Sequence, residues 1–167
     1  MIRHITEKDF FSFLEFCTIK YPDFYVTKNN QRLFLDNPDI IKKIFNTFIK
    51  HGDKAYILEE KMQILGTIIV SGYADKFERK YIKLAAQNNT IARDLLRYFI
   101  WNHKAECFLK IKKDNPILSL INNRMFSYTA SKNWGFKFVS NRGTELLFHY
   151  IPNRLQTVPY VKDEDND

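Results

Sequence analysis

A polar turn at residues 87–92, with the sequence Gln-Asn-Asn-Thr-Ile-Ala, separates two segments that have different hydrophobic patterns. Residues 80–86 form a short apolar run with β-branched and aromatic side chains, which predicts a strand. Apolar residues then recur at helical spacing from Ile91 to Ile100, which predicts a helix. The first N–H groups of a helix lack intrahelical acceptors, and the helix dipole adds partial positive charge there. The turn is therefore a candidate phosphate site.

The same turn also has a plain structural interpretation. Asn and Thr cap helices well, so residues 87–90 could do no more than begin the helix. The near-alternating pattern at residues 106–112 predicts a second strand after the helix. A strand, a helix and a strand of these lengths form a parallel crossover, and ligands of such units bind at the carboxyl ends of the strands. This context favours phosphate binding over a simple cap.

The remaining elements predict the fold class. A strand at residues 2–5, a hairpin of strands at 55–58 and 64–70, and a second hairpin at 135–139 and 144–150 are expected. The expected helices begin near Thr6 and Asp9, span residues 39–51, and run from Ile117 into the Tyr128 region. This order predicts an α/β fold with a central mixed sheet of about six to seven strands and helices on both faces.

Length and composition indicate one globular domain. The chain has 167 residues, of which 45% are hydrophobic, enough for a substantial core. We expect residues 1–152 to form this domain and residues 153–167 to form an acidic, disordered tail. Residues 162–167 hold a charge of −3, so the remainder holds +10. A basic surface of this kind can attract nucleic acid, anionic cofactors or acidic proteins.

Several classes of protein are disfavoured by the sequence. No apolar run approaches the roughly 20 residues of a membrane span, and the N-terminus lacks the pattern of a signal peptide, so we expect a cytoplasmic protein without membrane contact. Cys17 and Cys107 are expected to be core residues rather than disulfide or zinc ligands. The four histidines lack metal-ligand spacing, so no metal is expected.

Four short motifs, taken together, resemble one known family. Residues 64–69 (ILGTII) are similar to its third strand, and residues 87–96 (QNNTIARDLL) to its pyrophosphate loop and the paired-leucine helix that follows. Residues 112–116 (KKDNP) are similar to the end of its fifth strand, and residues 134–136 (WGF) to the start of its sixth. In this order and at this spacing they resemble the GNAT superfamily of N-acetyltransferases, over residues 1 to about 151.

The resemblance implies an acetyl-CoA-dependent N-acyltransferase, without a metal, that moves an acetyl group to a primary amine. The amine could belong to a small molecule, a peptide or a protein, and the sequence does not choose among them or give an oligomeric state. Asn115 could alternatively be only a turn residue before a proline. The residues that match the cofactor-binding motifs are Leu84, Ala85, Ala86, Gln87, Asn88, Asn89, Thr90, Ile91, Ala92, Arg93 and Asn115.

Catalysis in this family needs a base for the amine and a proton donor for the leaving thiolate. The family's tyrosine, four residues before its Gly-Phe pair, is Ser131 here, and Tyr128 is the nearest substitute on the helix expected there. Glu78 is the candidate base, with Glu59 and Glu60 considered beside it. The plainer interpretation of each glutamate is a solvated surface carboxylate. The plainer interpretation of Tyr128 is an aromatic side chain with a packing role.

The departures from the family pattern leave two alternatives. Thr90 stands where the family has glycine, so its Cβ narrows the approach of a phosphate and restricts positive φ. Gln87 replaces the commoner arginine. Together with Ser131 and the lack of a clear base, these departures admit a GNAT-like binding or structural module without catalysis. A basic nucleic-acid-binding protein is the less favoured alternative, because the basic residues are spread along the chain.

Overall fold

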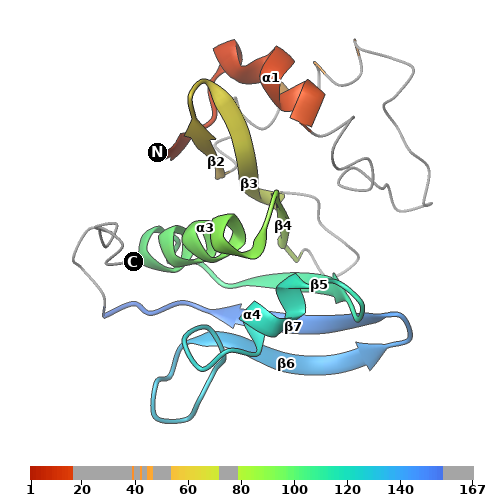
Figure 1. Cartoon of the computed structure of the whole chain (residues 1–167). Helices are drawn as coiled ribbons and strands as arrows, with labels where there is room; N and C mark the ends of the chain where they lie inside the picture. The colour runs from red at the N-terminus through yellow and green to blue at the C-terminus, as the bar shows by residue number, and fades with distance from the viewer. Residues whose placement is uncertain (17–38, 40–41, 43–44, 47–53, 72–78, 156–167) are drawn as a thin grey trace. The chain divides into compact units, whose positions relative to one another are not determined.

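The structure is a computed structural model that describes residues 1–16, 39, 42, 45–46, 54–71 and 79–155 (Figure 1). The chain divides into two compact units, Met1–Leu95 and Leu96–Asp167. In chain order the elements are β1 (Ile2–His4), the short 3-10 helix η1 (Glu7–Asp9), α1 (Phe10–Glu15), β2 (Ala55–Glu60), β3 (Gln63–Ser71), β4 (Tyr81–Ala86), α3 (Asn89–Asn102), β5 (Cys107–Lys112), α4 (Ile117–Ile121), β6 (Gly135–Arg142) and β7 (Glu145–Ile151).

In the first unit, the described residues form antiparallel strands in the order β1-β2-β3-β4. The β2–β3 hairpin matches the one expected from the sequence and turns at Lys61 and Met62, whose φ angles are 49° and 63°. Two consecutive left-handed residues are typical of the hairpin turn whose twist suits the flanking strands. Near the start of β3, Gly66 pairs with Ala86, the last residue of β4. This pairing sets where the chain leaves the sheet before α3.

Helices cover both faces of this sheet, as the sequence predicts. Phe13 of α1 joins Ile57 and Ile69 in a buried cluster on one face. On the other face, the first turns of α3 approach β3, because a Cβ built on Gly66 would lie 2.7 Å from Ile91 Cγ2. The start of α3 is thus seated directly on β3.

The N-terminal helical segment begins as expected. The Asp9 carboxylate accepts the Thr6 amide at 2.7 Å and the Thr6 hydroxyl at 3.1 Å. These bonds satisfy donors that would otherwise lack partners at the start of the segment. The expected continuation past Phe16, including Cys17, lies outside the described residues, as does most of the helix expected at 39–51. The four described residues of that segment, 39, 42, 45 and 46, are helical.

The second unit contains the antiparallel strands β5-β7-β6. The β6–β7 hairpin (Figure 1) turns at Gly143, whose φ of +77° favours glycine, and it confirms the hairpin expected there. Cys107 of β5 lies opposite Tyr150 of β7 and is buried, as expected of a core thiol. The Tyr150 hydroxyl donates to His103 O at 3.1 Å and is buried, and burial raises the pKa of this phenol. This part of the unit is a packed core.

The helix expected to run from Ile117 into the Tyr128 region is shorter than predicted. It ends at Ile121, and residues 122–134 form turns and loops. Local bonds outcompete the helix there: the Asn123 side chain accepts the Met125 amide at 3.0 Å, as Asn does in turns. Further along, Lys132 Nζ donates to two backbone carbonyls of the same segment at 2.8 Å. The placement of Tyr128 on a helix is therefore wrong.

The described residues form seven strands with helices between them, which is the α/β fold class expected from the sequence. Strands β4 and β5 belong to different units, so the parallel crossover between them stays a prediction. The domain limits 1–152 and the tail at 153–167 also stay predictions, and residues 156–167 lie outside the described part of the chain. In that described part, no helix combines the length and the apolar character that crossing a membrane requires.

Candidate cofactor-binding site

The turn between β4 and α3 is held to the sheet by its backbone. The Gln87 amide donates to Leu65 O of β3 at 2.9 Å, directly after β4 ends. Two residues, Gln87 and Asn88, then connect the strand to the helix. The turn is short and anchored at its first residue, so its exposed side has little freedom to move away from the helix start.

Asn88 caps α3. Its side-chain Oδ1 accepts the Ile91 amide at 3.0 Å, and its carbonyl oxygen accepts the Ala92 amide at 3.1 Å. This is the geometry of an N-cap residue. The capping interpretation is therefore confirmed for Asn88, whose Oδ1 serves the helix.

Two amide donors remain at the start of the helix. Within the described residues, the N–H groups of Asn89 and Thr90 donate to no acceptor, and both residues are exposed. The first turn of α3 contains no acidic residue. Two free amides at the positive end of a 14-residue helix suit an anionic group. Capping by Asn88 and anion binding by the next two amides are thus compatible.

Thr90 fits this site better than the sequence suggests. It lies within α3 and is absent from the residues of positive φ, which among the described non-glycine residues are Lys61, Met62 and Asn133. Its backbone therefore does not need the freedom of the glycine that the family pattern has there. The remaining effect of Thr90 is the bulk of its side chain beside its own amide.

The residues around the two free amides divide into packing residues and exposed ones. Ile91 and Ala92 are buried, so these side chains hold α3 on the sheet. Arg93 is half-buried, and its Nε lies 4.0 Å from Oδ1 of the buried Asp94. Leu84, Ala85 and Ala86 lie on β4 and lead into the turn. The groups able to contact a ligand are thus the exposed side chains of the turn and the backbone amides.

Asn115 lies in the second unit, after β5. Its Oδ1 accepts the Ile117 amide at 3.0 Å, and its own amide donates to Lys112 O at 3.0 Å. Both bonds belong to the turn that begins α4, so the turn interpretation of Asn115 accounts for its position. Asn115 and the start of α3 belong to different units, so its contact with a cofactor stays a prediction.

Tyr128 lies in the loop before β6. Its amide donates to Phe136 O at 3.0 Å, and Lys137 Nζ lies 5.2 Å from the centre of its ring. The ring is half-buried, and the hydroxyl bonds to no described residue. Ser131 is exposed, and its Oγ lies 3.2 Å from Thr129 Oγ1. The loop is closed by Gly135, whose φ is +119° and where a Cβ would lie 2.7 Å from Phe126 O.

Of the three glutamates considered as the base, the structure describes two, and these differ in their surroundings. Glu78 lies outside the described residues. Glu59 accepts hydrogen bonds from Arg3, which also binds Asp9, so Glu59 serves an ion-pair network at the N-terminus. Glu60 is exposed at the end of β2. Across the residues that the structure describes, no group of three His, Cys, Asp or Glu side chains could hold a metal ion.

Two features were not predicted from the sequence. One is the Arg3–Asp9 ion pair, whose only signal was the Thr6 and Asp9 spacing at a helix start. The other is a pocket between the end of β5 and the β6–β7 turn. The cluster of lysines at 110, 112 and 113 was the available signal for it.

The sequence matches no protein-family model and no curated protein. The structure, in contrast, is similar to solved acetyltransferases. A ribosomal-protein-alanine N-acetyltransferase from Brucella melitensis matches with a TM-score of 0.62 at 17% identity, over 90% of this chain and 99% of the other. A GNAT-family acetyltransferase from Streptococcus pneumoniae matches with 0.62 at 13%, over 92% and 99%.

A third similar structure contains a ligand. It is a putative acetyltransferase from Salmonella typhimurium with its cofactor acetyl-CoA, and it matches with a TM-score of 0.63 at 14% identity, over 99% of this chain and 98% of the other. At sequence identities this low, these matches show that this chain and the three solved structures share a fold. The chain therefore has the fold of the GNAT N-acetyltransferases, as its motifs predict.

Proposed function

We propose that this protein is an acetyl-CoA-dependent N-acyltransferase that acetylates a primary amine. The observation that carries the proposal is the pair of exposed amides of Asn89 and Thr90 at the start of α3, which donate to no acceptor among the described residues. They lie at the position where the sequence motif resembles a pyrophosphate loop, in a chain with the GNAT fold. An anion bound there would accept two N–H bonds and lie at the positive end of the helix.

The described residues fit such a cofactor in three ways. The two amides can donate to the pyrophosphate, and no carboxylate of the first helical turn opposes its charge. The Gln87 side chain is exposed next to them and offers a further amide donor. Gly66 leaves room for Ile91, which keeps the helix start close to the sheet. When bound, acetyl-CoA would supply the acyl group as a thioester.

The chemical step needs two proton movements. The neutral amine attacks the thioester carbonyl, so that a C–N bond forms and the C–S bond breaks. The amine nitrogen loses a proton to a base and the thiolate gains one from an acid. We assign the acid to Tyr128, whose hydroxyl has no partner within the described part of the chain. Glu78 remains the proposed base.

A matched pair of variants at Asn89 tests the cofactor site. Proline is tolerated in the first turn of a helix and removes one N–H, so Asn89→Pro deletes a proposed donor while the helix persists. Asn89→Ala removes the side chain and keeps the donor. Calorimetric titration with acetyl-CoA should show a loss of about tenfold or more in affinity for Asn89→Pro, as expected for a hydrogen bond to a charged group, and little change for Asn89→Ala.

Two results would contradict the proposal. One is the absence of both heat and thermal stabilisation at millimolar acetyl-CoA, because a ligand that binds only the folded protein must stabilise it. The other is equal binding by the two Asn89 variants. Circular dichroism of each variant controls for loss of the helix.

Ser131, which stands where the family has its tyrosine, favours a second candidate, a GNAT-like module that binds acetyl-CoA without transferring the acyl group. It differs from the first in turnover alone. Release of free thiol from acetyl-CoA with a panel of amines distinguishes them: thiol release above the amine-free rate supports the enzyme, and binding without release supports the module.

A further inference from the structure

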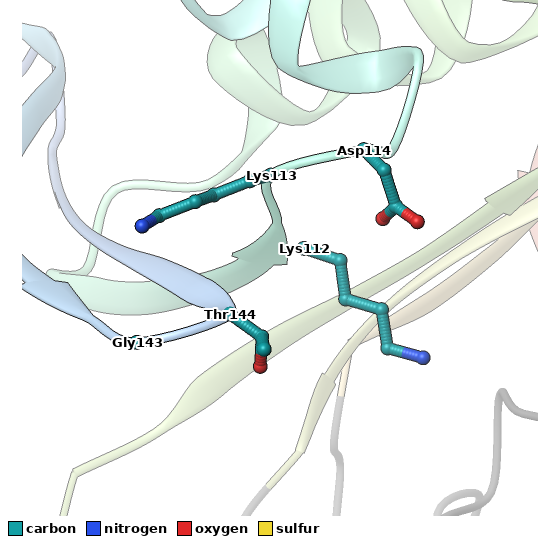
Figure 2. A pocket seen from close by; sticks show the side chains of 5 residues that line it. All are labelled: Lys112, Lys113, Asp114, Gly143 and Thr144. Atoms are coloured by element: carbon teal, nitrogen blue, oxygen red, sulfur yellow. The ribbon is translucent and has the colours of Figure 1, made fainter.

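A pocket lies at the end of β5, beside the turn of the β6–β7 hairpin (Figure 2). Its volume is about 500 Å³. Among the described residues, the side chains that line it are charged or hydroxylated, and carbon atoms also contribute to its surface. The lining residues are Lys112, Lys113, Asp114, Gly143 and Thr144.

The backbone fixes the two walls of this pocket to each other. The Lys113 amide donates to Thr144 O at 3.0 Å, which joins the end of β5 to the hairpin turn. Lys112 also lies opposite Glu145 in the β5–β7 register. Directly after β5, the Asn115 amide donates to Lys112 O at 3.0 Å. The side chains that line the pocket therefore extend from backbone segments that are hydrogen-bonded to each other.

The cations of this pocket are not compensated. Within the described residues, the ammonium groups of Lys112 and Lys113 form no ion pair, although Asp114 is adjacent in sequence and Glu145 lies across from Lys112. Two lysines against one aspartate leave the pocket a net positive charge. The Thr144 hydroxyl, at the β6–β7 turn, adds a neutral donor to the lining. These groups can all serve an anionic ligand.

The directions of the side chains limit the form of that ligand. Figure 2 shows that Lys112 and Lys113 extend away from each other from the end of β5. One compact ion could not bring both ammonium groups into contact at once. An extended anion with acid groups at separate positions could do so.

We propose that this pocket binds an extended molecule with two or more oxyanion groups, either carboxylates or phosphates. The proposal does not depend on acetyl-CoA binding at the start of α3. Two sources have the required chemistry: a separate polyanionic molecule, or a phosphate of coenzyme A itself. Direct binding measurements can establish the pocket and then distinguish these sources.

Amide NMR of the 20.0 kDa protein tests the pocket with citrate and pyrophosphate as probes, and with acetate as the compact comparison. We expect saturable shifts of the Lys113 and Thr144 amides with citrate or pyrophosphate, weaker binding of acetate, and weakening at higher salt through screening. Lys112→Gln and Lys113→Gln should each weaken binding about two- to fivefold, the range for an exposed ion pair.

Two further variants separate a local site from general charge. Asp114→Asn removes the one carboxylate of the lining and should tighten binding by a similar factor. Lys61→Gln changes the net charge equally at the exposed β2–β3 turn and should leave binding unchanged. The proposal is overturned if no saturable shift occurs, if Lys61→Gln weakens binding as much as the pocket variants, or if Asp114→Asn weakens it.

Competition then identifies the source. If acetyl-CoA displaces citrate and its 3′-dephospho form does not, the pocket holds a cofactor phosphate. If neither displaces citrate, the pocket holds a separate polyanion, and the site is still upheld. Failure of this site leaves the Asn89 comparison intact, and failure of the Asn89 comparison leaves this site intact, so the two proposals fail separately.

Discussion

Gly66 and Ile91 approach so closely that a side chain on Gly66 would overlap Ile91: an added Cβ would lie 2.7 Å from Ile91 Cγ2 and equally close to Leu95 Cδ1. This contact seats the first turns of α3 on β3, next to the turn that we assign to the cofactor. A side chain on Gly66 would therefore force Ile91 and Leu95 to shift.

We predict that Gly66→Ala destabilises the protein and weakens acetyl-CoA binding together, because α3 must move to make room. Overpacking of this kind costs about 1–3 kcal/mol. Urea unfolding and calorimetry measure the two effects. In an Ile91→Ala background, part of the overlap is relieved, so Gly66→Ala should cost less there. An equal cost in both backgrounds would contradict the packing argument.

Asn88 allows stability and binding to be driven in opposite directions. Asn88→Asp keeps an oxygen acceptor for the Ile91 amide and adds a negative charge at the positive end of α3, which is favourable by about 0.3–1 kcal/mol. The same charge repels a bound pyrophosphate, by about 1–4 kcal/mol for unit charges about 4 Å apart near a surface. We therefore expect an unchanged or raised melting temperature and a loss of roughly fivefold or more in acetyl-CoA affinity.

Asn88→Ser is the matched control for this prediction. Serine also caps helices and adds no charge, so stability and affinity should both stay near those of the wild type. If Asn88→Asp and Asn88→Ser bind acetyl-CoA equally well, the anion does not lie at this helix start.

Tyr128→Phe tests the proposed proton donor. Loss of one positioned acid lowers turnover by about 10²-fold or more, whereas acetyl-CoA affinity should not change, because the hydroxyl acts in the transition state. Ser131→Ala should leave both unchanged, since Ser131 is exposed and its Oγ lies beside Thr129 Oγ1. Normal turnover of Tyr128→Phe would remove Tyr128 from the mechanism.

The local patterns of the sequence predicted the strands and α3 well, for physical reasons. The alternation of β5 and the helical spacing from Ile91 to Ile100 reflect burial on one face, which short-range patterns record. The helix expected near Tyr128 failed because side-chain bonds such as Asn123 to Met125 compete with helical bonds over a few residues. The spacing of apolar residues does not show where such side-chain hydrogen bonds form.

The candidate site was predictable where it depends on the backbone of one turn, and not where it depends on distant segments. Asn88 and the two amides after it follow from a strand, a turn and a helix that are adjacent in sequence. The pocket at Lys112 and Thr144 brings together residues about thirty positions apart through the β5–β7 pairing. The lysines and the hairpin were each predictable from the sequence, but their proximity was not, because it depends on the pairing of β5 with β7.

The ion pair between Arg3 and Asp9 gives a prediction for stability against pH. The Arg3 guanidinium, which donates to both Asp9 carboxylate oxygens at 2.7 and 2.8 Å, lowers the pKa of Asp9 below its ordinary value of 3.8, and the Thr6 amide and hydroxyl lower it further, although burial opposes them. A lowered folded-state pKa means that the unfolded chain binds a proton first as the pH falls. The stabilisation is therefore complete above about pH 5 and is lost as the pH falls through 3.8 toward the folded-state pKa.

Asp9→Asn isolates this contribution. The variant has no carboxylate to titrate at this position, so its free energy of unfolding should be lower than that of the wild type at pH 7, and the difference should narrow as the pH is lowered below 3.8. Urea unfolding at pH 7, 5, 4 and 3 measures both curves. A difference that stays constant across this range would show that the Asp9 pKa is the same in the folded and unfolded chain, which would contradict the geometry of the Arg3 pair.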